Sequence, residues 1–232
     1  MPESLNLVQK IAIWVIPALF AITLHEVAHG FVANRLGDPT AKMLGRLSVN
    51  PFRHIDLFGT IIVPLVMLFL PGGFIFGWAK PVPVGERNLG NPRRDMALVG
   101  AAGPAANFLM AVAWALVIRL GLALSASASS IALPIALAGV AGVFINSLLM
   151  VFNLLPLPPL DGGRVAVSLM PPRYARVYER VEPFGIWIIV LLLFTGVLGF
   201  VLYPVLQGCF SFFALFAGVS PGNLWYLLGN LM

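Results

Sequence analysis

The sequence predicts an all-α polytopic membrane protein, because it has too few charges for a water-facing surface and these charges lie between long uncharged stretches. Of the 232 residues, 59% are hydrophobic and 10% are charged, and the mean hydropathy is +0.95. A soluble domain carries about 25% charged residues. We therefore expect a single domain, residues 1–232, with four to six transmembrane helices in a lipid bilayer.

Four segments have the ~20 mostly apolar residues that a membrane-spanning helix needs. They are residues 9–36, 94–120, 131–155 and 184–203. A shorter apolar segment, residues 57–70, would measure only about 21 Å as a helix, so we expect a short re-entrant element that enters and leaves by one face. The apolar tail after residue 206 is expected to form a further span or to lie in the interface.

A small membrane-associated β-hairpin is predicted between residues 74 and 84, where the sequence reads FIFGWAKPVPV. Aromatic and β-branched residues around a glycine favour a hairpin. Pro81 and Pro83 lie two residues apart, so the N–H groups that they lack would both be missing from one strand edge. That edge could not form a full ladder of hydrogen bonds.

The basic residues predict an orientation in the membrane. Of the 14 Lys and Arg residues, 12 lie in three clusters within residues 35–53, 80–94 and 164–180. If residues 57–70 are re-entrant, all three clusters share one side, which the positive-inside rule makes cytoplasmic. The net charge of +5 then suits anionic lipid, and we expect no nucleic-acid partner. The single cysteine, Cys209, excludes an internal disulfide.

The main chemical motif is HEVAH, which runs from His25 to His29 in the first apolar segment. Positions i and i+4 lie on one face of a helix, so the two imidazoles could hold one zinc ion. Glu26 lies beside them and could take a proton from a zinc-bound water. Ionisable groups within an apolar run are costly and usually mark function. We therefore expect His25 and His29 to bind metal and Glu26 to act as general base.

A catalytic zinc usually has three protein ligands and one open position. The candidates for the third ligand are His54 and Asp161 and, less well placed, Asp56, Glu86 and Asp95. Asp161 follows a proline-rich stretch, LLPLPPL, whose irregular backbone would be tolerated at membrane depth beside a wet cavity, although Asp161 could also be a helix N-cap. His54 lies in a charged loop and could simply bond Asp56. The residues alone leave this choice open.

Three motifs in order carry a family resemblance. HEVAHG, AGPAAN at residues 102–107 and NLLPLPPLDGG at residues 153–163 together resemble the site-2 protease family of intramembrane zinc metalloproteases. The stretches GWAKPVPV and NPFRHIDLFGT resemble its compact bacterial and archaeal branch, which has no PDZ or CBS domain. The resemblance covers most of residues 17–164 and little of the tail.

The resemblance implies that His25, His29 and Asp161 hold one Zn²⁺ per chain and that Glu26 is the general base. It also implies that Asn153 lies near the scissile peptide, where its amide could stabilise substrate or the oxyanion. Asn107 is expected to pack between helices, with Gly103 and Pro104 allowing a close approach.

The implied substrates are single-span membrane proteins cut within or near the bilayer. The catalytic core would cover about residues 9–170 and the C-terminal helices residues 184–232. We expect a prokaryotic cell membrane, with the active site near the cytoplasmic face. The alternative is an ion or metal transporter or channel that uses the same His, Glu and Asp residues. The sequence does not predict an oligomeric state.

Overall fold

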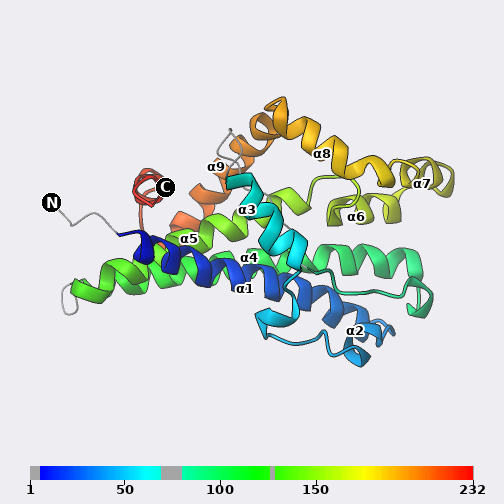
Figure 1. Ribbon diagram of the computed structural model, residues 1–232, viewed down its shortest axis with the longest axis horizontal. Helices are drawn as coiled ribbons and strands as arrows, with labels where there is room; N and C mark the ends of the chain where they lie inside the picture. The colour runs from blue at the N-terminus through cyan, green and yellow to red at the C-terminus, as the bar shows by residue number, and fades with distance from the viewer. Residues whose placement is uncertain (1–5, 69–79, 126–128, 232) are drawn as a thin grey trace.

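The computed structural model describes residues 6–68, 80–125 and 129–231, and within these ranges the chain forms helices and no β-strand. Figure 1 shows the arrangement. The α-helices are α1 (Leu7–Arg35), α2 (Thr40–Met43), α3 (Val63–Leu68), α4 (Pro92–Leu124), α5 (Ser129–Asn153), α6 (Asp161–Leu169), α7 (Pro172–Glu179), α8 (Gly185–Phe194), α9 (Val197–Ala217) and α10 (Pro221–Gly229). Short helical turns cover Pro51–Arg53, Leu57–Ile62, Glu86–Asn88 and Glu182–Phe184. The all-α class is therefore confirmed for the described residues.

The centre of the molecule is a bundle of α1, α4 and α5, which lie side by side in Figure 1. Contacts between α1 and α4 join His29 to Val99 and His25 to Asn107, so these two helices are antiparallel. Asn107 also contacts Asn146 of α5. The helix α9 packs against α4 and α5. This arrangement brings the C-terminal half of α1 against the N-terminal half of α4.

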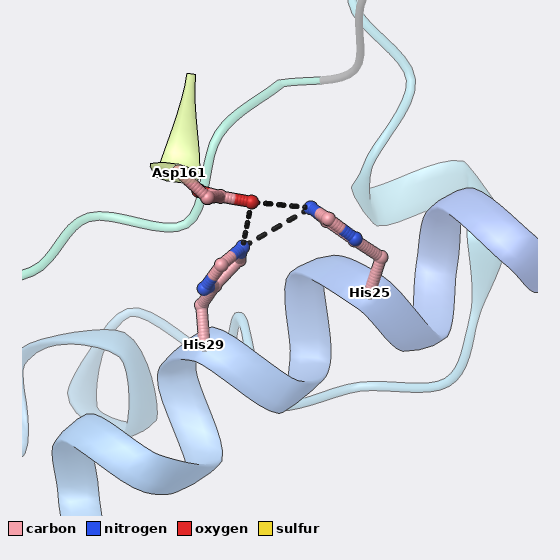
Figure 2. A group of neighbouring side chains, drawn as sticks. All are labelled: His25, His29 and Asp161. Carbon is pink, nitrogen blue, oxygen red and sulfur yellow. Dashed lines mark hydrogen bonds and ion pairs between the residues drawn. The ribbon is translucent and has the colours of Figure 1, made fainter. Parts of the chain in front are cut away.

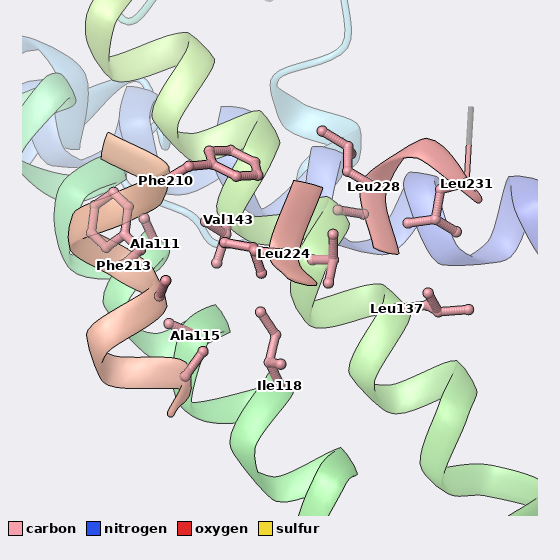
Figure 3. Packing of buried hydrophobic residues seen from close by; sticks show 14 of the residues in the cluster. Ala111, Ala115, Ile118, Leu137, Val143, Phe210, Phe213, Leu224, Leu228 and Leu231 are labelled. Atoms are coloured by element: carbon pink, nitrogen blue, oxygen red, sulfur yellow. The ribbon is translucent and has the colours of Figure 1, made fainter. Parts of the chain in front are cut away.

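The apolar core lies away from the His residues, towards the end of the bundle where α4 and α5 are joined. Figure 3 shows side chains from α4, α5, α9 and the C-terminal end of the chain packed together there. Its labelled members are Ala111, Ala115 and Ile118 of α4, Leu137 and Val143 of α5, Phe210 and Phe213 of α9, and Leu224, Leu228 and Leu231 at the C-terminal end. Because lipid tails are as apolar as leucine, helices in a bilayer associate by close packing of such faces.

Four helical segments are long and apolar enough to cross a membrane: Val8–Arg35, Pro92–Leu124, Ile131–Asn153 and Val197–Ala217. The first three confirm the predicted spans at residues 9–36, 94–120 and 131–155. The fourth prediction, residues 184–203, was wrong, because the helix breaks at Gly196 between α8 and α9. The fourth long helix instead lies in the tail whose role the sequence left open.

The break is a backbone property of Gly196, which has a φ of +75°, in the left-handed region. Glycine adopts this conformation at little cost, whereas a residue with a Cβ does not. The helix α8 therefore ends after ten residues, a length of about 15 Å, which is too short to cross the bilayer.

The predicted β-hairpin at residues 74–84 is not supported. Residues 69–79 lie outside the described ranges, and residues 80–84 have no strand structure. Pro81 and Pro83 remove two ladder donors, and the N–H of Val82 between them is bonded to Glu26 rather than to a strand.

Only part of the predicted re-entrant element is described. Residues Leu57–Ile62 form a π-helical turn that continues into α3, and the segment after Leu68 is outside the described ranges. The N–H of Lys80 donates to the carbonyl of His54 at 2.9 Å. The chain before residue 57 and the chain at Lys80 therefore lie side by side. The re-entrant course of residues 57–70 stays a prediction.

The loops that carry the basic clusters meet at one end of the bundle, on the right of Figure 1. The N–H of Gly90 donates to the carbonyl of Leu36 at 3.2 Å, which joins the end of α1 to the start of α4. The Arg93 side chain donates to the carbonyl of Met170, between α6 and α7. The three clusters therefore share one end, as the charge pattern predicts.

Asp38 connects two of these loops. It is fully buried, and its carboxylate accepts hydrogen bonds from Thr40, from the N–H of Gly85 at 2.7 Å and from the Asn88 amide at 2.8 Å. Burial alone would raise the pKa of Asp38, but these donors outweigh it and lower the pKa below its ordinary value. The loop after α1 is thereby fixed against the loop before α4.

Candidate metal centre

Two histidines of α1 and the first residue of α6 form a buried group of three ligand atoms, shown in Figure 2. His25 Nε2 and His29 Nε2 lie 3.1 Å apart. Asp161 Oδ2 lies 3.1 Å from the first and 3.2 Å from the second. All three side chains are buried. The helical spacing thus aligns the imidazoles as predicted, and Asp161 completes a nearly equilateral triangle.

The triangle has the size that a tetrahedral zinc ion requires. Zinc lies ~2.0–2.1 Å from nitrogen and oxygen ligands, which places ligands about 3.3–3.4 Å apart. The observed separations of 3.1–3.2 Å are close to this value. Three protein ligands leave the fourth position open, as in catalytic zinc sites.

The hydrogen bonds behind the imidazoles aim their lone pairs into this triangle. His25 Nδ1 faces Asn107 Oδ1 at 2.5 Å, and His29 Nδ1 faces the carbonyl of Val99 at 2.7 Å. Both partners are acceptors, so each Nδ1 carries a proton, and in the neutral ring each Nε2 is left with a lone pair. Asp161 Oδ2 is buried without a hydrogen bond. Three converging acceptors with no donor repel one another unless a cation lies between them, so these residues fit a metal ion.

Gly103 of α4 provides the space for this group. A Cβ at this position would lie 2.4 Å from His29 Nε2 and 2.6 Å from His25 Nε2. Any side chain would therefore displace the ligands. The close approach predicted for Gly103 is present, and it serves the site.

The DGG sequence explains how Asp161 reaches α1. A Cβ on Gly162 would lie 2.4 Å from the carbonyl oxygens of Leu154 and Leu155, so α6 begins in tight contact with the end of α5. The N-cap of α6 is Leu160, and Asp161 is the first residue inside the helix. The interpretation of Asp161 as an N-cap was therefore wrong, and its carboxylate points to the histidines.

Glu26 lies beside the ligands and is half-buried. Its Oε2 accepts a 2.8 Å hydrogen bond from the N–H of Val82. A cavity of about 430 Å³ is lined by Glu26, the three ligand residues and Asn153, among others. Asn153 donates its side-chain N–H to the carbonyl of Leu149, one turn earlier in its own helix, at 3.0 Å. Its predicted role at the oxyanion stays a prediction.

The other candidates for the third ligand do not join the histidines. His54 is buried, and its Nε2 bonds the carbonyl of Ser48 at 2.8 Å. Asp56 and Asp95 each accept a backbone N–H at the start of a helical segment. Glu86 is exposed in a short turn.

Two asparagines make contacts at the site that the sequence did not predict. Asn107 was expected only to pack between helices, yet it bonds the ring of His25. Asn146 of α5, which was not considered, bonds Asn107 at 2.9 Å. Both are fully buried. Fully buried amides within apolar helices are costly unless paired, and that cost was the available signal.

A bundle with four apolar helices of membrane-spanning length and a buried two-histidine, one-aspartate group beside a glutamate is the arrangement expected of a membrane-embedded metallopeptidase. Comparison with known sequences agrees. The family model "Peptidase family M50" matches residues 120–196. The chain belongs to this family, the site-2 protease family, because its similarity to curated relatives extends over most of both chains.

Three relatives illustrate this. "Putative zinc metalloprotease YwhC" of Bacillus subtilis is 38% identical over 216 residues, covering 88% of this chain and 91% of that protein. The Rip2 protein of Mycolicibacterium smegmatis, which carries the same description, is 30% identical over 87% of this chain and 73% of its own length. The Rip2 protein of Mycobacterium tuberculosis H37Rv is 30% identical over 83% of this chain and 67% of its own length. No solved structure matches the chain.

Proposed function

We propose that this chain is an intramembrane zinc metalloprotease that cuts peptide bonds within or near the transmembrane segments of membrane proteins. The observation that carries this proposal is the convergence of His25 Nε2, His29 Nε2 and Asp161 Oδ2 beside Glu26. Membership of a peptidase family and the zinc metalloprotease relatives support it. One Zn²⁺ per chain would be held by these three ligands.

The mechanism follows from the groups around the cavity. Zinc, when bound, polarises a carbonyl and makes hydroxide available from water near neutral pH. With zinc bound, Glu26 would take a proton from the attacking water, whose oxygen forms the new bond to the carbonyl carbon, and would pass that proton to the peptide nitrogen as the C–N bond breaks. The N–H of Val82 holds Glu26 in place for this work through Oε2. Asn153 lines the same cavity, and its amide can donate to the oxyanion after turning away from Leu149.

Water reaches the site from the end of the molecule that carries the basic clusters. A second cavity of about 600 Å³ shares Val82, Leu160 and Arg164 with the wall of the metal cavity. Three acidic residues line it, Glu86, Glu179 and Glu182. By the positive-inside rule this end is cytoplasmic. The site would therefore lie near the cytoplasmic face of a prokaryotic cell membrane. Residues 57–70 would be re-entrant, in keeping with the hydrogen bond between Lys80 and His54.

The substrates we propose are single-span membrane proteins. A helical peptide has its carbonyls engaged in hydrogen bonds, so the substrate must unwind locally before hydrolysis. The apolar residues of the cavity wall, such as Ile22, Phe152 and Ile189, suit a substrate segment that comes from the lipid. Neither the matching family nor the named relatives favour the alternative function, an ion or metal transporter.

The test uses the purified chain in detergent. Zinc is measured by mass spectrometry, and cleavage is measured with a panel of single-span substrates for the parent, Glu26→Gln, Asp161→Asn and a control, Arg119→Gln, which neutralises an exposed charge away from both cavities. We expect zinc in all but Asp161→Asn, and cleavage only by the parent and the control. A parent that binds no zinc overturns the metal site. Cleavage by Glu26→Gln at the parent's rate overturns the general base. Zinc flux into liposomes without proteolysis favours the transporter.

A further inference from the structure

The Asn107 amide lies between three helices, and both its oxygen and its nitrogen are hydrogen-bonded. Its Oδ1 faces His25 Nδ1 at 2.5 Å. Its Nδ2 donates to the carbonyl of Ala21 at 3.3 Å and to Asn146 Oδ1 at 2.9 Å. Asn146 in turn donates its Nδ2 to the carbonyl of Gly142 at 2.9 Å. The chain of contacts thus leads from a backbone carbonyl of α5 to a metal ligand of α1.

We propose that Asn146 is a positioning residue of the metal site and fixes, through Asn107, which nitrogen of His25 carries the proton. The inference rests on the proposed function only in taking His25 as a zinc ligand. It assigns a role to a residue that does not line the metal cavity and that is linked to the His25 ring through Asn107.

The direction of each amide follows from acceptors that cannot donate. The carbonyl of Gly142 can only accept, so Asn146 must turn its NH₂ towards it and its oxygen towards Asn107. Asn107 then meets two acceptors, that oxygen and the carbonyl of Ala21, so its NH₂ faces both and its oxygen faces His25. His25 Nδ1 must therefore donate, and its Nε2 is free to bind metal.

The opposite arrangement would disable the ligand. If Asn107 turned its NH₂ to His25, Nδ1 would have to accept and the proton would move to Nε2. That proton would point at Asp161 Oδ2, only 3.1 Å away, and occupy the direction of the metal. A buried polar network that is fully paired holds one arrangement, whereas a network with a missing partner does not. By accepting a hydrogen bond from the Asn107 amide, Asn146 favours the tautomer of His25 that carries its proton on Nδ1.

The same relay couples the tautomer to the assembly of the bundle. Its members come from α1, α4 and α5, and both asparagines are fully buried. A shift of α5 along α4 would separate Asn146 from Asn107 and remove the preference. The productive tautomer of His25 is therefore expected only once the three helices have packed.

Nitrogen NMR measures which ring nitrogen of each histidine carries the proton. The sequence has only three histidines, so ¹⁵N-histidine labelling gives three ring systems in the NMR spectrum of the zinc-free chain, recorded over a series of pH values. We expect His25 to carry its proton on Nδ1 in the parent. Asn146→Leu should add a population with the proton on Nε2. Ser147→Ala is the matched control, since Ser147 is equally buried and its hydroxyl has no hydrogen-bond partner.

Zinc affinity, measured by competition with a chelator, should fall at least about tenfold in Asn146→Leu, since partners behind a metal ligand typically contribute 10–100-fold. Asn146→Asp should restore it, because a buried carboxyl is protonated and keeps both a donor and an acceptor. Asn146→Ala removes the same amide and is measured if the leucine variant does not fold. The absorption spectrum of the Co²⁺-loaded chain should change in Asn146→Leu and should return to that of the parent in Asn146→Asp.

The outcomes separate the two proposals. A parent without zinc affinity overturns the proposed metal site. A parent that binds zinc, with Asn146→Leu matching Ser147→Ala in tautomer and affinity, overturns the relay alone. Loss of affinity in Asn146→Asp equal to that in Asn146→Leu also overturns the relay, because the carboxyl keeps both bonds.

Discussion

The backbone N–H of Val82 donates a 2.8 Å hydrogen bond to Oε2 of Glu26. Pro81 and Pro83 flank Val82 and have no N–H. Val82 is therefore the single donor of this tripeptide, and it faces the general base that we propose. Pro81 and Val82 also line the metal cavity. The segment that was predicted to be one strand of a hairpin instead donates a hydrogen bond to Glu26.

The first prediction concerns this donor. Val82→Pro removes the N–H and should lower kcat/KM about tenfold or more, because a hydrogen bond to a charged group contributes about 1.5–3 kcal/mol. Zinc content should stay at the parent's value. Val82→Ala keeps the N–H and is the control. Equal rates for the two variants would show that the bond has no part in catalysis.

The second prediction concerns the space at Gly103. Gly103→Ala should abolish zinc binding and proteolysis together, because its Cβ would lie 2.4–2.6 Å from the two Nε2 atoms. Zinc per chain in the purified variant is the measurement. Gly208→Ala is the control, because that glycine is also helical and has open space around it. Full zinc content in Gly103→Ala would contradict the geometry of the site.

The third prediction concerns pH and Asp38. The folded chain lowers the pKa of this carboxyl, so the stability that it contributes is present above its ordinary pKa of about 3.9 and is lost as pH falls through the lower folded value. Asp38→Asn should lower the melting temperature in detergent at pH 7, and the difference from the parent should shrink below about pH 4. A difference that is constant from pH 7 to pH 3 would contradict this assignment.

The fourth prediction concerns the break between α8 and α9. Gly196→Ala should destabilise the chain by about 1–2 kcal/mol, because a Cβ is unfavourable at its φ of +75°. Nothing lies within 4 Å of that Cβ, so the effect is one of backbone strain alone. Gly208→Ala should instead stabilise by about 0.5–1 kcal/mol, since it replaces glycine inside a helix. Unfolding in mixed detergent micelles compares the two.

The sequence predicted the parts of the site that follow from short spacing. His25 and His29 lie one turn apart, and helix geometry alone places them together. The third ligand, Asp161, lies far along the chain, and mainly the resemblance to a family favoured it over His54. The contact between α1 and α6 depends on tight packing at Gly162, which no local pattern reports.

Other features were missed because their cause is not local. Hydropathy placed a span at residues 184–203, since glycine is common in membrane helices and the left-handed backbone of Gly196 leaves no trace in an apolar average. The donor of Val82 is a main-chain group, so no side-chain pattern could reveal it. The sequence does not distinguish Asn146 from other polar residues, because its contact with Asn107 forms between two different helices.

The distance along the chain between the ligands has a consequence for biosynthesis. His25 and His29 emerge early from the ribosome, but Asp161 follows only after α4 and α5 have been made. A partly synthesised chain therefore carries two thirds of a ligand set and cannot hold the metal in this geometry. The three-ligand site therefore cannot form before the chain has been made as far as the start of α6.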